Sequence, residues 1–361
     1  MNANVPWWRT QLDEREADAA RDAILAGKLS QGPITAELEE SLAKALNVPF
    51  VTMTTSGSSA LVSALVAAGV GPGDEVIVPN RTFIATAHAV QLIGATVRLA
   101  DTLMDRPLID PEQVEAKVNS KTRAILPVHV NGGVCDMAAL RDIADRHGLK
   151  LIEDTAQGLF SKQNDKFLGT IGDYGCYSFG VTKVMTTGQG GFVVTHDEGN
   201  FEKLQRMRFH GVSSPRQGSF EHFGFNFRYT DFQAAVALQQ LKRIPEKIKS
   251  HRDLYTRYRE ALAGNNRVRL QYTDLDIGEL PLWNQVMCED RQALVEHLTA
   301  NGVGTMNTTP NLNASPHLSD KGPFPNSDRF QVQELILPSG PDQDPAQIDR
   351  VLEALASFET H

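Results

Sequence analysis

Cysteine is scarce in this sequence, and long apolar runs and dense basic clusters are absent. The three cysteines, Cys135, Cys176 and Cys288, are widely spaced and form no C-x-x-C pair, so neither a disulfide framework nor a thiolate zinc site is indicated. No run approaches the roughly 18 apolar residues that a membrane-spanning helix needs, and the first residues lack the pattern of a signal peptide. The sequence therefore predicts a cytoplasmic protein that spans no membrane.

The charge balance is slightly acidic. Lys and Arg number 35 and Asp and Glu 44, which gives a net charge of −9, and the basic residues form no cluster. Because nucleic-acid surfaces gain affinity mainly by neutralising phosphates with basic side chains, we expect no nucleic-acid partner. The 361 residues suffice for about two domains, whose cores need no disulfide or metal.

Short β-rich apolar runs alternate with helical patterns between residues 50 and 200. The expected strands are 75–78, 96–99, 124–130, 149–153, 175–179 and 191–194. The spacing between the first four leaves room for a crossover helix each time, as in the helical pattern of 138–147. This order predicts an α/β fold with a mostly parallel sheet covered by helices on both faces. In such sheets, ligands bind at the carboxyl ends of the strands.

A second, smaller unit is expected in the last third of the chain. Asp231 is placed to cap a helix over 231–241. Beyond Pro245 the pattern gives helices over 248–263, 290–301 and 345–358, with weaker strands near 280–287. The polar stretch 305–329 is expected to be a long loop. We therefore predict a large domain over 1–243, which includes an amino-terminal arm (1–35), and a small α+β domain over 244–361.

Hydroxyl residues and a glycine precede an apolar helical run in the segment 54–62 (TTSGSSALV). The N–H groups in the first turn of a helix form an anion site, and Gly57 permits close approach of the backbone. The segment therefore fits a phosphate. Simple capping of the helix by Ser or Thr is the alternative.

Asp154 stands at the end of an expected strand, in the segment 152–157 (IEDTAQ). Its carboxylate is expected in the binding crevice, where it can pair with a protonated heterocyclic nitrogen, hold a metal or cap the next turn. Adjacent Glu153 points to the opposite face of the strand. Since no other ligand lies at a suitable spacing, we expect no metal.

A single lysine, Lys183, lies among apolar, hydroxyl and glycine residues between the last two expected strands. Lysine is rarely buried without a function, and burial lowers its pKa toward the neutral amine that attacks carbonyl groups. Lys183 is therefore a candidate for Schiff-base chemistry. The alternative is an exposed loop lysine.

These segments belong to a longer series of motifs. The series comprises 27–33 (GKLSQGP), 55–61 (TSGSSAL), 71–79 (GPGDEVIVP), 127–129 (PVH), 153–157 (EDTAQ), 169–173 (GTIGD), 178–183 (SFGVTK), 208–211 (RFHG), 224–228 (GFNFR) and 233–235 (QAA). In this order they closely resemble the DegT/DnrJ/EryC1/StrS family of sugar aminotransferases, which use pyridoxal 5′-phosphate (PLP) on the aspartate aminotransferase fold, called fold type I. The resemblance runs nearly end to end and fades in the carboxyl-terminal third.

The resemblance implies PLP as the cofactor and assigns residues to it. Lys183 would bind PLP covalently and move the proton during catalysis, and Asp154 would pair with the pyridine nitrogen. Gln157 would lie near the phenolic oxygen. Phe83 would stack on the ring, with a core phenylalanine as the alternative. The residues implied for the phosphate are Gly57, Ser58, Ser178 and, from the neighbouring subunit, Asn226.

The resemblance also implies a homodimer with shared active sites and transfer of an amino group from L-glutamate to a keto-sugar. The leading acceptor is a nucleotide-linked keto-deoxysugar, used in amino-sugar biosynthesis for a surface polysaccharide or glycoside. Arg81 and Arg228 are predicted to bind the anionic substrate, because they lie close to motif positions.

One departure bears on the acceptor. Relatives usually carry an arginine and a His-containing segment in the stretch that is 305–317 here, and the run 305–311 (TMNTTPN) of this chain has no arginine. A keto-sugar without a nucleotide is therefore an alternative. A PLP-dependent dehydratase and a sugar-binding protein without covalent chemistry are two others, and Lys183 disfavours the dehydratase.

Overall fold

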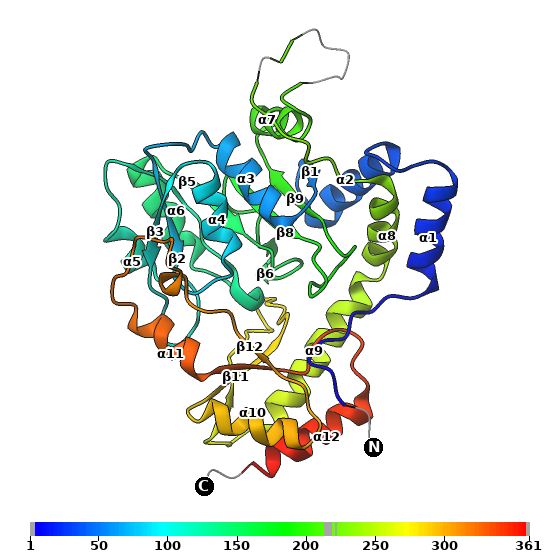
Figure 1. Cartoon of the computed structure of the whole chain (residues 1–361), viewed down its shortest axis with the longest axis vertical. Helices are drawn as coiled ribbons and strands as arrows, with labels where there is room; N and C mark the ends of the chain where they lie inside the picture. Colours follow the sequence, from blue (N-terminus) through cyan, green and yellow to red (C-terminus); the bar gives the residue numbers. More distant parts are fainter. Residues whose placement is uncertain (1–3, 213–218, 221, 359–361) are drawn as a thin grey trace.

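The computed structural model describes residues 4–212, 219–220 and 222–358. Within this part of the chain, no helix is long and apolar enough to cross a membrane. Two main sheets organise the fold, one of seven strands and one of four (Figure 1). A short hairpin of β6 (Lys162–Gln163) and β7 (Lys166–Phe167) forms a third, two-stranded sheet.

The seven-stranded sheet has the order β1-β9-β8-β5-β4-β2-β3. Its strands are β1 (Phe50–Thr54), β2 (Glu75–Pro79), β3 (Thr96–Ala100), β4 (Thr122–Ile125), β5 (Lys150–Asp154), β8 (Tyr174–Ser178) and β9 (Gly191–Thr195). Neighbouring strands from β3 to β8 are parallel, whereas β9 runs antiparallel to both β8 and β1. The mostly parallel sheet is therefore confirmed.

Helices cover both faces of this sheet and give three layers (Figure 1). One face carries α3 (Gly57–Ala67), α4 (Ala85–Leu92) and α7 (Glu198–Arg208). The other carries α2 (Pro33–Leu46), α5 (Pro111–Glu115), α6 (Met137–His147) and α8 (Asp231–Lys242), with α1 (Glu14–Leu25) against α8. The central strands are buried on both faces, so apolar residues fill most of their length, and polar residues stand mainly at their ends, as Glu153 and Asp154 do in β5.

The four-stranded sheet is antiparallel and has the order β10-β11-β13-β12. Its strands are β10 (Val268–Leu270), β11 (Asn284–Cys288), β12 (Met306–Asn307) and β13 (Glu334–Leu337), with helices α9 (Ile244–Ala261), α10 (Arg291–Ala300), α11 (Pro325–Gln333) and α12 (Pro345–Ala356). This smaller unit has its own apolar core, in agreement with the α+β fold expected there. The boundary between residues 243 and 244 falls where α9 begins and stays a prediction.

The amino-terminal region adds features that the sequence patterns do not reveal. Val5 lies in the apolar core of the smaller unit, and Trp8 forms a bridge with Ser339 of that unit. The segment expected to be an arm contains α1 and the start of α2. Strand β1 is defined by its antiparallel pairing with the distant β9, which local periodicity does not predict.

Asp231 does not cap α8, so this expectation is wrong. The N-cap of α8 is Thr230, and no side chain caps that helix. The buried Asp231 carboxylate instead accepts hydrogen bonds from the N–H groups of Gly32 (2.8 Å) and Thr35 (2.9 Å) and from the Thr35 hydroxyl (2.7 Å). Asp231 therefore caps α2, whose own N-cap residue, Gly32, has no side chain to do so.

Replacing Asp231 with Asn should destabilise the fold. An NH₂ group then takes the place of a carboxylate oxygen that faces N–H donors, and the unpaired buried groups cost about 2 kcal/mol. Urea denaturation followed by circular dichroism measures the change. The exposed Asp105 provides the control, because D105N should alter stability by less than about 0.5 kcal/mol. Equal effects of the two substitutions would contradict the capping role.

Candidate active site

A cavity lies at the carboxyl ends of β5 and β8, next to the start of α3. Its volume is about 190 Å³. The predicted site residues that line it together are Gly57, Ser58, Phe83, Asp154, Gln157, Ser178 and Lys183. Segments far apart in the sequence thus meet where a parallel sheet is expected to bind its ligand.

Helix α3 begins at this cavity with a capping box. The Ser56 hydroxyl accepts a hydrogen bond from the N–H of Ser59 (3.1 Å), and the Ser59 hydroxyl accepts one from the N–H of Ser56 (2.9 Å). The N–H groups of Gly57 and Ser58 are therefore left for a ligand. With the hydroxyls and the helix dipole, they form a cradle for an anion. Capping and anion binding, the two alternatives for this segment, are compatible.

Gly57 is needed for the cradle because the backbone comes close to the end of β8. A Cβ at this position would lie 2.8 Å from the Cβ of Ser178, closer than two such carbon atoms can approach. The glycine therefore lets the start of α3 and the Ser178 hydroxyl face the same small volume.

The Asp154 carboxylate is buried in the cavity wall, with the residue 5% exposed. It accepts hydrogen bonds from the Thr86 hydroxyl (2.9 Å) and from the N–H of Ala156 (3.1 Å). Burial raises the pKa of Asp154, while these hydrogen bonds and the charge of Lys183 act in the opposite direction. The carboxylate thus offers a hydrogen-bonded negative charge to a cationic group in the cavity.

Lys183 lies in the loop between β8 and β9 and faces the same cavity. Burial lowers the pKa of Lys183 to about 8, and the Asp154 carboxylate opposes this shift. The amine also lies 5.5 Å from the centroid of the Trp283 ring. A lysine with this pKa is partly neutral, and hence nucleophilic, near pH 8. Because Lys183 is half-buried and lines the cavity, it is not the exposed loop lysine of the alternative.

Gln157 is held in one orientation by the backbone. Its side-chain oxygen accepts a hydrogen bond from the N–H of Asn131 (2.7 Å), so its NH₂ group is the part that can donate into the cavity. Asn131 is held in turn by Trp283, through its oxygen (2.6 Å to the Trp283 N–H) and its NH₂ group (2.9 Å to the Trp283 carbonyl). The segment before β11 of the smaller unit thereby helps to orient a donor in the cavity.

Glu153 points away from the cavity, as the alternation along a strand predicts. Its carboxylate accepts hydrogen bonds from His129 Nε2 (2.9 Å) and from the N–H groups of Gly169 (2.8 Å) and Ile171 (2.8 Å). Burial raises the pKa of Glu153, but the bonds from His129 and the backbone outweigh burial, and the net shift is downward. Glu153 therefore braces the turn that leads into β8.

Phe83 lines the cavity and is 55% exposed, which rules out the alternative of a core phenylalanine. Asn226 and Arg228 do not line this cavity. The Asn226 oxygen accepts a hydrogen bond from Arg228 Nε (2.9 Å), and the guanidinium lies 4.8 Å from the centroid of the Phe209 ring. Their roles in binding phosphate and substrate stay predictions.

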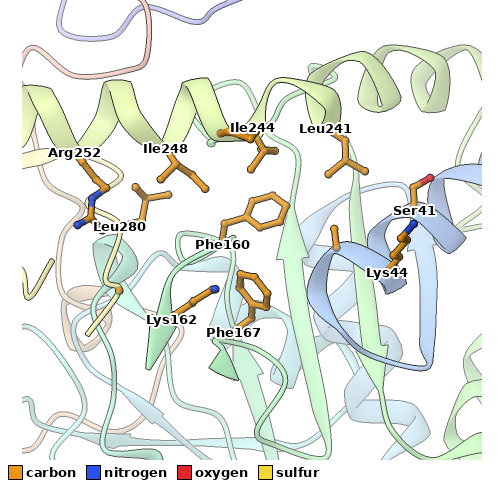
Figure 2. Close-up of a pocket in the computed structure, with 13 residues that line it drawn as sticks. Ser41, Lys44, Phe160, Lys162, Phe167, Leu241, Ile244, Ile248, Arg252 and Leu280 are labelled. Atoms are coloured by element: carbon orange, nitrogen blue, oxygen red, sulfur yellow. The ribbon is translucent and has the colours of Figure 1, made fainter. Parts of the chain in front are cut away.

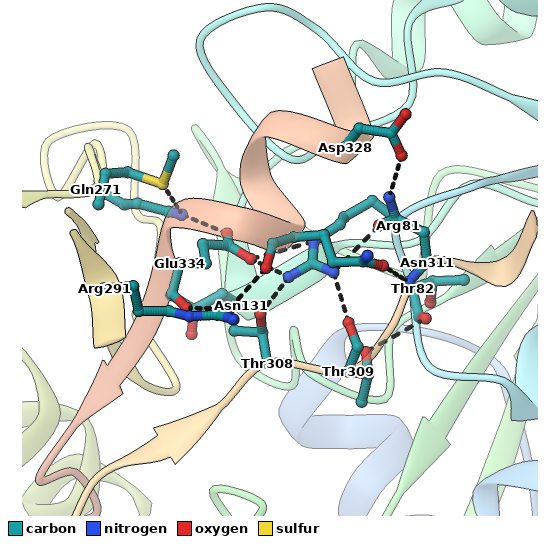
Figure 3. Close-up of polar contacts among 12 residues, drawn as sticks. Arg81, Thr82, Asn131, Gln271, Arg291, Thr308, Thr309, Asn311, Asp328 and Glu334 are labelled. Carbon is teal, nitrogen blue, oxygen red and sulfur yellow. Dashed lines mark hydrogen bonds and ion pairs between the residues drawn. The ribbon is translucent and has the colours of Figure 1, made fainter. Parts of the chain in front are cut away.

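Arg81 lies in an internal network and does not line the cavity (Figure 3). Its buried guanidinium forms an ion pair with Glu334 at the start of β13. It also donates to the Thr309 carbonyl (2.5 Å), the Asn311 side-chain oxygen (3.2 Å) and the Thr308 hydroxyl. Arg81 therefore links the segment 305–311, which has no arginine of its own, to the residues that follow β2. Its role in substrate binding stays a prediction.

Several residues that shape the cavity were not predicted from the sequence. The Ser-x-x-Ser spacing of Ser56 and Ser59 is a detectable capping signal. Thr86 bonds Asp154 across 68 residues and Asn131 bonds Trp283 across 152 residues, so no local pattern marks either contact. The described residues contain no group of three or more His, Cys, Asp or Glu that could hold a metal ion.

Comparison with known proteins gives relatives that match nearly the whole chain. GDP-perosamine synthase of Caulobacter vibrioides is 33% identical over 96% of this chain and 95% of its own length. The dTDP-3-amino-3,4,6-trideoxy-α-D-glucose transaminase of Streptomyces venezuelae is 36% identical, over 95% of this chain and 92% of its own.

Solved structures share the fold. DesV of S. venezuelae, determined in complex with a ketimine intermediate, matches with a TM-score of 0.94 and 33% identity, covering 99% of this chain and 100% of DesV. A DegT/DnrJ/EryC1/StrS aminotransferase from Brucella abortus matches with a TM-score of 0.91 and 29% identity, over 96% of each chain. The predicted aminotransferase fold, with its mostly parallel central sheet, is therefore confirmed.

The family model for the DegT/DnrJ/EryC1/StrS aminotransferases matches residues 10–356. This range includes both sheets and every residue that lines the cavity. The resemblance first indicated by the motifs is thus confirmed, and the protein is an aminotransferase that belongs to the DegT/DnrJ/EryC1/StrS family.

Proposed function

We propose that this aminotransferase uses PLP and transfers an amino group from L-glutamate to a keto-sugar. One observation carries the proposal: a nucleophilic lysine, a buried carboxylate and an anion cradle line the same cavity. The donor set fits PLP, which carries an aldehyde, a basic ring nitrogen and a phosphate. When bound, PLP supplies a ring that accepts electrons from the substrate carbon as a proton leaves it.

Each residue has a separate task in this proposal. The N–H groups of Gly57 and Ser58 bind the phosphate, together with the Ser58 and Ser178 hydroxyls. Asp154 keeps the ring nitrogen protonated by placing a negative charge beside it. Gln157 donates from its NH₂ group to the phenolic oxygen.

Lys183 is the residue that acts on protons. Its Nζ would hold PLP through the aldehyde carbon, with the aldehyde oxygen leaving as water, and its amine, once free again, would accept the proton that leaves the substrate carbon. The exposed face of Phe83 would pack against the ring.

The acceptor is proposed to be a nucleotide-linked keto-deoxysugar. The names of the relatives, a GDP-perosamine synthase and a dTDP-amino-sugar transaminase, support this class. The segment 305–311 has no arginine, and Arg81 is fully engaged with protein acceptors, so a keto-sugar without a nucleotide is the second candidate.

The proposed assembly is a homodimer in the cytoplasm, with Asn226 reaching the phosphate of the neighbouring subunit. Asn226 is exposed and lies outside the cavity of its own chain, as a residue that acts in the partner's site would. The three cysteines are buried and free, which supports a reducing compartment.

A panel of keto-sugars tests the substrate class. Purified protein with PLP and L-glutamate should release 2-oxoglutarate with a nucleotide-linked keto-sugar and much more slowly with the same sugar lacking its nucleotide. Equal rates would favour the second candidate. If no sugar of the panel supports release of 2-oxoglutarate, although borohydride traps PLP on the protein, the proposed acceptor class is contradicted.

The rate at which PLP-free protein captures PLP should rise with pH through about 8. Only the neutral amine attacks, and the pKa of Lys183 is lowered to about 8 by burial. Because Asp154 raises this pKa, D154N should move the midpoint to a lower pH. Stopped-flow absorbance measures both profiles, and K183A, which should give no borohydride-trapped adduct, is the control. A midpoint that stays in place or rises in D154N would contradict this coupling.

Replacing Gly57 with Ala should weaken binding of PLP but leave binding of pyridoxal, which has no phosphate, nearly unchanged. The added Cβ meets Ser178 at 2.8 Å and pushes the cradle apart, so we expect at least a tenfold loss of PLP affinity, or about 1.4 kcal/mol. Absorbance titration of the PLP-free protein gives both dissociation constants.

Gly71 is the matched control for this substitution, because a Cβ there meets no atom within 4 Å. G71A should bind PLP and pyridoxal as the unchanged protein does. If G57A weakens binding of PLP and of pyridoxal equally, the substitution acts outside the phosphate cradle, and the role proposed for Gly57 is contradicted.

A further inference from the structure

A second cavity lies beside the junction of α8 and α9 and shares no lining residue with the candidate active site. Its volume is about 670 Å³. Its walls come from α2, the β6–β7 hairpin, the first turns of α9 and the segment around Leu280 (Figure 2). Neither the family motifs nor the proposed reaction gives this cavity a role.

The floor of the second cavity is apolar. Phe160, Ile244 and Leu280 are buried there. Phe167 meets the edge of Phe160, with ring centroids 5.9 Å apart and planes at 80°. Ile248 adds an aliphatic side chain from α9 (Figure 2). A floor of this kind binds a ring or hydrocarbon chain by removing apolar surface from water.

The rim of the cavity is cationic, although the whole chain carries a net charge of −9. The three charged residues that line it are Lys44, Lys162 and Arg252, and no carboxylate lines it. The Lys162 ammonium lies 4.4 Å from the centroid of the Phe167 ring, which holds a positive charge directly over the apolar floor.

These cations differ from their neighbours in having no acidic partner. On α9, Lys249 forms an ion pair with Asp253, and Arg243 just before it pairs with Asp13 and Glu16. No ion pair with Asp or Glu involves Lys44, Lys162 or Arg252 among the described residues. Three unpaired positive charges around an apolar floor are complementary to an anion with an apolar body.

We propose that this cavity is a binding site for an anionic amphiphile, a molecule in which a ring or hydrocarbon chain carries a phosphate or sulfonate group. The apolar part lies on Phe160, Phe167 and Leu280, and the anionic group lies among the three cations. An uncharged sugar would leave the three cations without an anionic partner, and a divalent cation would find no carboxylate ligand there.

The fluorescent dye 1-anilinonaphthalene-8-sulfonate tests the site in the PLP-loaded protein, and N-phenyl-1-naphthylamine is the same apolar body without the charge. The sulfonate dye should saturate one site per chain. The triple variant K44Q/K162Q/R252Q should bind it at least tenfold more weakly, while its affinity for the neutral dye should stay within twofold of that of the unchanged protein.

A45F, which places a phenyl ring in the cavity, should lose both dyes. Farnesyl phosphate should displace the sulfonate dye, and farnesol should not.

A matched variant separates the effect of the cavity's own cations on dye binding from the effect of the net charge of the protein. Residues Arg21, Lys121 and Lys203 are exposed and lie outside the cavity, so R21Q/K121Q/K203Q makes the same change in net charge and should leave dye binding intact. The melting temperature and the transamination rate should be unchanged in all variants. Loss of dye binding and loss of the proposed activity are therefore measured separately, and one can fail without the other.

Two results would overturn the proposal. One is dye binding that neither the triple variant nor A45F alters. The other is a change in oligomeric state of A45F in sedimentation, which would assign this surface to a second copy of the chain.

Discussion

Asp154 places a carboxylate at the buried end of β5, where ionisation costs free energy unless donors or a cation lie close. One donor, the N–H of Ala156, is local. The Thr86 hydroxyl on α4 and the charge of Lys183, which follows β8, come from elsewhere in the chain. Because β5 and β8 are neighbours in the sheet, the loops that follow them open into the same cavity. The order of the strands is therefore what brings the nucleophilic amine to the carboxylate.

The two adjacent acids of β5 have opposite tasks. Glu153 is fully enclosed by His129 and backbone donors and holds the turn that precedes β8. Asp154, on the other face, keeps an open side toward the cavity. A one-residue slip in the register of β5 would exchange them, so the hydrogen bonds of Glu153 secure the register on which the cavity depends.

Features encoded in short segments were predictable from the sequence, and features made by distant contacts were not. The central strands, Lys183, Asp154 and the start of α3 each follow from a local pattern. Strand β1 depends on pairing with β9, and the orientation of Gln157 depends on Asn131 and Trp283. Arg81 follows a strand as a typical binding residue would, yet its partners lie more than 200 residues away, and only the fold reveals that they occupy its guanidinium.

The capping of α2 by Asp231 also sets an order of events during synthesis on the ribosome. The helix is complete in sequence long before the residue that satisfies its first N–H groups has been made, since the contacts span 196 to 199 residues. Until then its apolar face, which includes Leu38, Leu42 and Leu46, lacks its partners on α8. All seven strands of the large sheet precede α8 in the sequence, so this layer is the last part of the large unit to be completed, and its apolar surface is open to wrong contacts until then.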